Sequence, residues 1–243
     1  MQHQKPASFM NILAFMTFVM VPALILFPHS TLAAGSAYVV EDADLVDHKS
    51  CEAELWHSRA NKNNRHSVLT TSCNPFGGFE IGGEIAIERE DGERANNVVI
   101  NGKTILWDDD VQNIALGLFG GAAYETRNGR LAEIFAIVPV SIDATDSLAL
   151  NLNLGWLWDR EERDHELTWG AGFDWTVIAG YDGLPETALI TEIFGQTGGD
   201  RVGFQFGLRP SVIEDKMHLD LIYGRNITGS RNHWFTIGTG ITF

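Results

Sequence analysis

The chain has 243 residues, with 17 Lys and Arg against 32 Asp and Glu and a formal net charge of -15. A chain this acidic has no electrostatic attraction for nucleic acid, which excludes nucleic acid as a partner. A mean hydropathy near zero, 25 glycines and a scarcity of helical periodicity favour strands and turns over helices. We therefore expect an all-β chain.

The N-terminal residues have the pattern of an export signal. Lys5 supplies a positive start, Met10 to Phe27 is almost continuously apolar, and Ala33 to Ala37 offers small residues for cleavage. Retention as a membrane anchor is the alternative, because the apolar stretch approaches the length of a bilayer span. We predict a signal peptide at 1–34, a periplasmic N-terminal segment at 35–50 and a strand-rich domain at 51–243.

Two cysteines, Cys51 and Cys73, follow the export signal and would therefore meet an oxidising compartment. A hairpin symmetric about Lys62 places Leu55 opposite Leu69 and Cys51 opposite Cys73. This register predicts a cross-strand disulfide that fixes the pairing of the first hairpin. A metal or catalytic role is disfavoured, because the chain has no Cys-x-x-Cys motif and no matching histidine cluster.

Apolar and polar residues alternate almost continuously from residue 51 to the end, with short polar or Gly/Pro/Asp clusters between the alternating segments. In the clearest case, the even-numbered residues from Leu148 to Trp156 are Leu or Trp, and those between them are Ala, Asn or Gly. We expect twelve antiparallel strands, at about 51–59, 66–73, 77–89, 95–107, 111–124, 131–141, 147–158, 165–177, 185–195, 201–210, 216–225 and 233–243. A single-chain bacterial barrel needs an even number, and ten strands is the alternative.

The strand lengths favour a transmembrane β-barrel over a soluble sandwich. Many segments reach ten residues, which exceeds the usual sandwich strand and suits tilted membrane-spanning strands. Tryptophans fall near strand ends, where an interfacial girdle is expected, at Trp107, Trp156, Trp158 and Trp234. We predict a barrel in the bacterial outer membrane, in contact with membrane lipid and lipopolysaccharide. Residues 38–50 could fold back into its lumen.

The polar faces of the strands carry the candidate lumen-lining residues. These are Glu54, Glu80, Glu84, Lys103, Asn151, Asn153, Asp174, Glu192, Arg201, Arg209, His218 and Asp220. Carboxylates outnumber bases, so a wet lumen would favour cations or neutral solutes over anions. Alternatively, the bases pair with the acids and fill a narrow barrel with ion pairs, and twelve strands leave both interpretations open.

The last strand ends on an aromatic residue, with apolar side chains on one face at Phe235, Ile237, Ile241 and Phe243. This pattern resembles the closing-strand signal of bacterial outer-membrane proteins. The resemblance implies that the barrel-assembly machinery is a partner during biogenesis.

Several short motifs are shared with a known group of proteins. They are Cys51–Trp56, Ser72–Pro75, Asn151–Trp156 with Asp159-Arg160, Leu167–Gly170 and Glu192–Gly195. In these the chain resembles proteobacterial outer-membrane barrels related to the phenol-degradation (meta-pathway) transporters. The resemblance implies movement of hydrophobic or aromatic compounds and supplies no catalytic residues.

We therefore predict a passive channel or facilitator for small solutes, with no catalytic residues, metal or cofactor. A lipid-modifying outer-membrane enzyme is one alternative, which would need a nucleophile beside a histidine such as His57, His66 or His165 near the outer rim. No motif typical of such enzymes surrounds them. A structural barrel without transport is the other alternative.

Overall fold

The computed structural model describes residues 37–243 apart from short gaps at 61–63, 91–92, 110, 128, 161, 181–183, 200–201, 215 and 230–231. The predicted signal peptide at 1–34 lies outside the described residues. In the described part of the chain, no helix is both long and apolar enough to cross a membrane.

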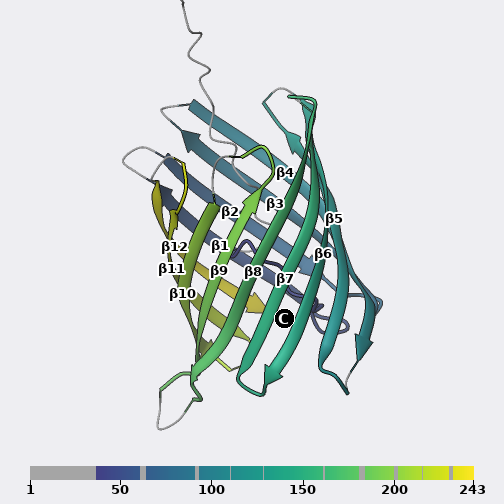
Figure 1. The fold of residues 1–243 in the computed structure, drawn as a ribbon, viewed down its shortest axis with the longest axis vertical. Helices are drawn as coiled ribbons and strands as arrows, with labels where there is room; N and C mark the ends of the chain where they lie inside the picture. Colours follow the sequence, from purple (N-terminus) through teal and green to yellow (C-terminus); the bar gives the residue numbers. More distant parts are fainter. Residues whose placement is uncertain are drawn as a thin grey trace, which may run out of the picture. The chain divides into compact units, whose positions relative to one another are not determined.

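Twelve antiparallel strands form one closed barrel (Figure 1). In chain order they are β1 (Cys51–Ala60), β2 (Asn64–Cys73), β3 (Phe79–Glu90), β4 (Glu93–Asp109), β5 (Ile114–Glu125), β6 (Arg130–Thr145), β7 (Leu148–Asp159), β8 (Asp164–Ile178), β9 (Thr187–Gln196), β10 (Val202–Ile213), β11 (Met217–Asn226) and β12 (His233–Thr242). Each strand pairs with its sequence neighbours, and β1 pairs with β12 to close the ring. The predicted class and strand number are confirmed.

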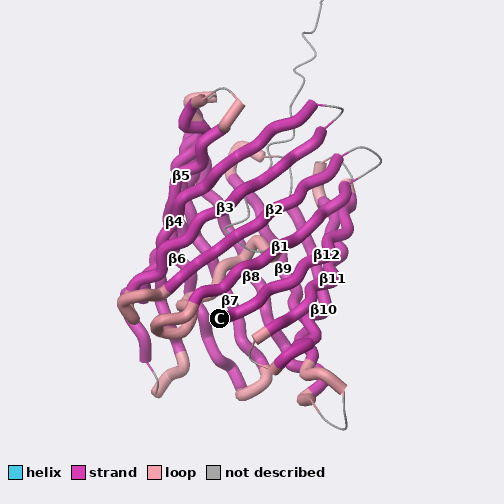
Figure 2. The backbone as a smooth tube through the Cα atoms, turned by 180° about the vertical axis from the view of Figure 1, so that it is seen from behind, coloured by secondary structure: helices cyan, strands magenta, loops and turns pink. Residues whose placement is uncertain are grey.

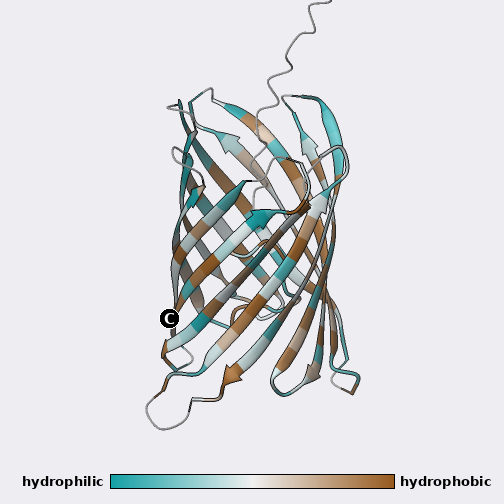
Figure 3. Cartoon of the chain, turned by 60° about the vertical axis from the view of Figure 1, so that its left-hand side comes forward, coloured by the Kyte–Doolittle hydropathy of each residue, from teal (hydrophilic) through white to brown (hydrophobic). Residues whose placement is uncertain are grey.

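Alternation along the strands separates an apolar outward face from an inward face that is polar on most strands, and Figure 3 shows it as changing bands of colour. On β5 the inward face instead carries buried Phe119 and Ala123 with glycines. Ile100, Leu154 and Ile237 are 70%, 63% and 58% exposed on the outward face. A continuous surface of exposed large apolar side chains suits contact with hydrocarbon.

The prediction of an interfacial girdle is wrong for one tryptophan. Trp234 lies on the inward side of β12, where its Nε1 donates a hydrogen bond of 3.1 Å to Oε1 of Gln205. It fits there because its partner on β11 is Gly224, which leaves room for the indole ring.

Some strands run further than predicted. β4 continues to Asp109 and β6 to Thr145, beyond the expected ends at 107 and 141. The polar residues at these ends look like turns in the sequence, but the register shows the hairpin ladders continuing through them.

The first hairpin has the predicted register, with Leu55 opposite Leu69. A disulfide joins Cys51 to Cys73, whose Cα atoms are 4.0 Å apart. Cys51 also exchanges two backbone hydrogen bonds with Phe243. The start of β1, the end of β2 and the C-terminus therefore meet at one end of the barrel, here called the disulfide end.

Candidate functional site

The described candidate lining residues all lie on the inward face, and Arg201 lies outside the described residues. Six of them are buried: Glu80, Glu84, Lys103, Asn151, Glu192 and Asp220. Glu84 has Glu88 as its charged neighbour, and the side chains of the others fall into two groups by what they contact. One group holds a segment of chain inside the barrel, and the other meets where the barrel closes.

Residues 37–50, which precede β1, lie inside the ring of strands, and we call them the luminal segment (Figures 1 and 2). The amides of Val39 and Val40 each donate a 3.0 Å hydrogen bond to the Glu192 carboxylate on β9. The Glu41 amide donates to Oδ1 of Asn153 on β7, and Nδ2 of Asn153 donates to the Glu41 carbonyl, both at 2.7 Å. Wall side chains thus supply the partners that a strand neighbour normally supplies.

The second half of the luminal segment runs along the wall to the disulfide end. The Ala43 amide donates to Oγ of Ser141 on β6 at 2.8 Å. The Val46 amide donates to Oε2 of Glu80 on β3 at 2.9 Å, and Nδ2 of Asn74 donates to the Val46 carbonyl at 2.7 Å. The backbone is therefore fixed to four strands and the β2–β3 turn before it enters β1.

An ion-pair cluster ties the middle of the luminal segment to the wall. Nζ of Lys103 lies 3.0 Å from Oε2 of Glu41 and 3.0 Å from Oδ1 of Asp42. Burial raises the pKa of Glu41 to about 7, although Lys103 opposes the rise. Burial by itself would raise the pKa of Asp42. The charge and the hydrogen bond of Lys103 outweigh burial, and the pKa of Asp42 is lowered. Burial and the nearby Asp42 raise the pKa of Asp44 to about 6.

The start of the described segment packs into a small apolar cluster. Tyr38 is buried against Ile190 and Ile222, and the Arg209 guanidinium lies 5.0 Å from the centroid of its ring. A Cβ at Gly207 would collide with the Tyr38 hydroxyl. Glycine at this inward position therefore makes room for the luminal segment.

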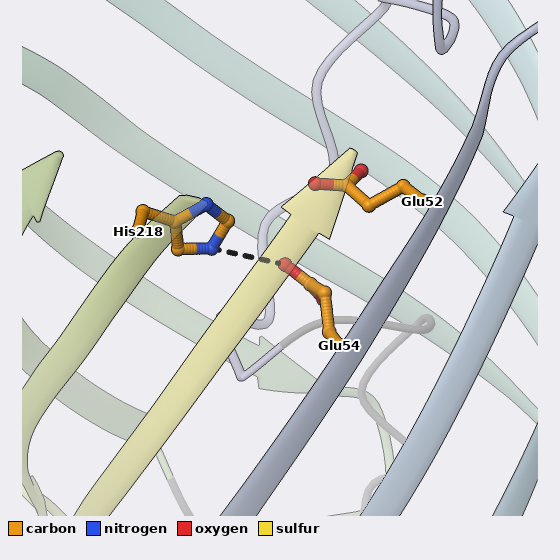
Figure 4. A group of neighbouring side chains, drawn as sticks. All are labelled: Glu52, Glu54 and His218. Carbon is orange, nitrogen blue, oxygen red and sulfur yellow. Dashed lines mark ion pairs between the residues drawn. The ribbon is translucent and has the colours of Figure 1, made fainter. Parts of the chain in front are cut away.

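A second cluster lies where β11, β12 and β1 close the barrel, and we call it the seam cluster (Figure 4). Arg209 on β10 donates two hydrogen bonds, of 2.8 and 3.2 Å, to Asp220 on β11. Nε2 of His218 lies 3.5 Å from Oε1 of Glu54 and 3.4 Å from Oδ2 of Asp220. Glu52, the next inward residue on β1, completes the cluster.

Residues 38–50 fold back into the lumen, as the sequence analysis allowed, but sequence reasoning did not identify Tyr38, Glu41 and Asp42 as site residues. The one available signal was an acidic stretch before the first strand, opposite a single inward lysine. Its location depends on contacts between residues 112 and 153 positions apart, such as Glu41 with Asn153 and Val39 with Glu192. Local periodicity carries no information about such contacts.

The geometry described so far defines the class of protein as a transmembrane-type β-barrel with a polar, partly filled lumen. Residues 23–243 match the model of the uncharacterised conserved protein family UCP029691, so the chain belongs to this family. No curated protein matches the chain. The predicted relation to the phenol-degradation transporters is not among these findings and stays a prediction.

Solved structures of outer-membrane channels share the fold. The KdgM porin has a TM-score of 0.64 at 12% identity, over 79% of this chain and 99% of that one. The NanC porin has a TM-score of 0.60 at 12% identity, over 78% and 98%. The COG4313 outer membrane channel from Pseudomonas putida F1 has a TM-score of 0.61 at 10% identity, over 83% and 98%. The chain therefore has a porin-like fold, and these neighbours support an outer-membrane location.

Proposed function

We propose that the protein is an outer-membrane channel or facilitator that passes small neutral or cationic solutes through its lumen, beside the luminal segment. The charge of the inward wall is the observation that carries the proposal. Inward carboxylates at Glu54, Glu80, Glu84, Asp174 and Glu192 outnumber inward bases such as Lys103 and Arg209. A lumen with excess negative charge concentrates cations and repels anions.

The luminal segment increases this bias. Asp42 and Asp44 add carboxylates to the lumen, and Lys103 is already engaged by Glu41 and Asp42. Lys103 is therefore a poor attractant for a passing anion. The pathway differs from a lumen lined by unpaired bases, which would select anions.

The test is ion selectivity of the refolded barrel in a planar bilayer. Under a KCl gradient, we expect the sign of the reversal potential to show that K⁺ permeates better than Cl⁻. The variant Glu54→Gln/Glu84→Gln should move this potential toward zero, because it removes inward negative charge. The control Asp146→Asn changes an exposed carboxylate in the β6–β7 turn, outside the strands, and should leave selectivity unchanged.

Liposome swelling with galactose and galacturonate extends the test to solutes. Faster entry of the neutral sugar supports the proposal, and faster entry of the acid contradicts it. Small aromatic amines and phenols should be measured in the same vesicles, because the family resemblance implies aromatic compounds. The absence of both channel events and solute entry would leave a structural barrel, whereas lipid turnover in the preparation would indicate an enzyme.

The outward face supports two further proposed partners. Its exposed apolar side chains suit membrane lipid, with lipopolysaccharide at the outer rim. Phe235, Ile237, Ile241 and Phe243 of the closing strand are 46–71% exposed. They are therefore accessible to the barrel-assembly machinery during insertion.

A further inference from the structure

Two glycines on the inward face of β12 create the space for the seam cluster. Glu54 on β1 and His218 on β11 are both register partners of Gly240. A Cβ at Gly240 would collide with Cε1 of the His218 ring, and one at Gly238 would lie 3.5 Å from Cβ of Asp220. Because β12 has no side chains here, residues of β1 and β11 reach each other across it.

The distances in this cluster suit a metal better than direct hydrogen bonds. Ligand atoms of Glu52, Glu54 and His218 all lie within 4.8 Å of one another (Figure 4). Nε2 of His218 is buried, and among the described residues no acceptor is aligned for it. Its separations of 3.5 and 3.4 Å from two carboxylate oxygens exceed a normal hydrogen bond of about 2.9 Å. The separation from Glu54 matches the roughly 3.3–3.6 Å between neighbouring ligands of a tetrahedral ion with bonds of about 2.0–2.2 Å, whereas the oxygen at 3.4 Å belongs to Asp220, which pairs with Arg209.

The charge of the cluster also suits a divalent cation. Arg209 makes a bidentate pair with Asp220, and its Nη2 is 4.0 Å from Oε1 of Glu54. With Arg209 and Asp220 balanced, Glu52 and Glu54 leave two negative charges beside the imidazole. The side chains of His218 and Glu54 are 18% and 14% exposed.

We propose that Glu52, Glu54 and His218 bind a divalent transition-metal ion, with zinc as the best chemical match. Imidazole nitrogen and carboxylate oxygen are both zinc ligands, and three protein ligands leave the fourth position of a tetrahedral ion to water. Magnesium and calcium prefer sites made only of oxygen ligands. The bound ion links β1 to β11 across β12, at the place where the barrel closes.

The test is zinc titration of the refolded, metal-stripped full barrel by calorimetry. We expect one saturable zinc per barrel. Glu54→Gln and His218→Gln should each weaken the affinity about tenfold or more, since loss of even an outer-sphere partner of a metal ligand has an effect of that size. His66→Gln is the matched control, because His66 also pairs with an inward glutamate, Glu88, at 3.1 Å. It should leave the affinity unchanged.

Gly240→Ala tests the site without removing a ligand. The new methyl displaces the flexible imidazole, so zinc affinity should fall, whereas Gly238→Ala should change it less. X-ray absorption of the zinc-loaded wild-type barrel should show one imidazole with oxygen ligands, and this measurement does not depend on any variant folding. Absence of saturable zinc binding, equal affinity in His218→Gln, or a first shell without one imidazole would overturn the proposal. His218 would then be an ion-pair partner of the carboxylates.

Discussion

The lumen has two polar regions whose carboxylates have different kinds of partner. Along β3 to β9, Glu80 and Glu192 accept hydrogen bonds from backbone amides of the luminal segment. At the seam, Glu54 and Asp220 face cationic or imidazole side chains instead. Backbone amides hold a carboxylate and the segment together, whereas the seam cluster holds strands of the wall to one another. The first region therefore fixes the luminal segment to the wall, and the second fixes the closure of the wall itself.

Removal of the luminal segment should have the largest effect on transport. Deletion of residues 37–46 takes backbone and side chains out of the lumen, so single-channel conductance should rise by about twofold or more. Glu192→Ala removes the anchor of Val39 and Val40 and should raise the open probability, with a smaller change in single-channel conductance than in the deletion variant. Glu88→Gln, which alters the Glu88 pair with His66, is the control. Unchanged conductance in the deletion variant would contradict a role of the segment in limiting flow.

Removal of the disulfide should affect the stability of the seam more than transport. Cys51→Ser/Cys73→Ser removes the covalent link between two residues 22 positions apart, beside the pairing of β1 with β12. The free energy of unfolding in urea should fall by about 3 kcal/mol. The wild-type barrel with reductant should show the same loss, and the double variant should not respond to reductant. A loss confined to the reduced wild type would instead indicate damage by the reductant.

Docking of the luminal segment should depend on pH. The pKa of Glu41 is about 7 in the lumen against an ordinary value of 4.5, so docking is fully favoured below about 4.5 and weakens as pH rises through 7. Asp44, with a pKa of about 6, acts in the same direction, and Asp42, with its lowered pKa, acts in the opposite one. Open-channel probability should therefore be higher at pH 8 than at pH 5.

The pH effect can be assigned with one variant. Glu41→Gln keeps the side chain uncharged at every pH and should leave a smaller dependence, due to Asp44, Asp42 and the carboxylates that anchor the segment. Bilayer recordings at both pH values measure the difference. Equal open probability of the wild type at pH 5 and pH 8 would argue against titration of Glu41 as a control on docking.

Local pattern in the sequence was sufficient for the fold. Alternation gave the twelve strands and the face of each side chain, because period two is a property of the extended backbone itself. Hairpin symmetry gave the pairing of Cys51 with Cys73 for the same reason. Strand ends such as Asp109 and Thr145 were missed, since a polar hairpin beyond the apolar band looks like a turn.

The sequence by itself thus determined a closed barrel with an acidic inward face. Only the tertiary structure decided which inward residues meet. Glu192 holds Val39 because the luminal segment crosses the ring, and Glu54 meets His218 because β12 presents Gly240 between them. Both contacts join residues more than 150 positions apart, and closure of the barrel, which no local pattern encodes, brings them together.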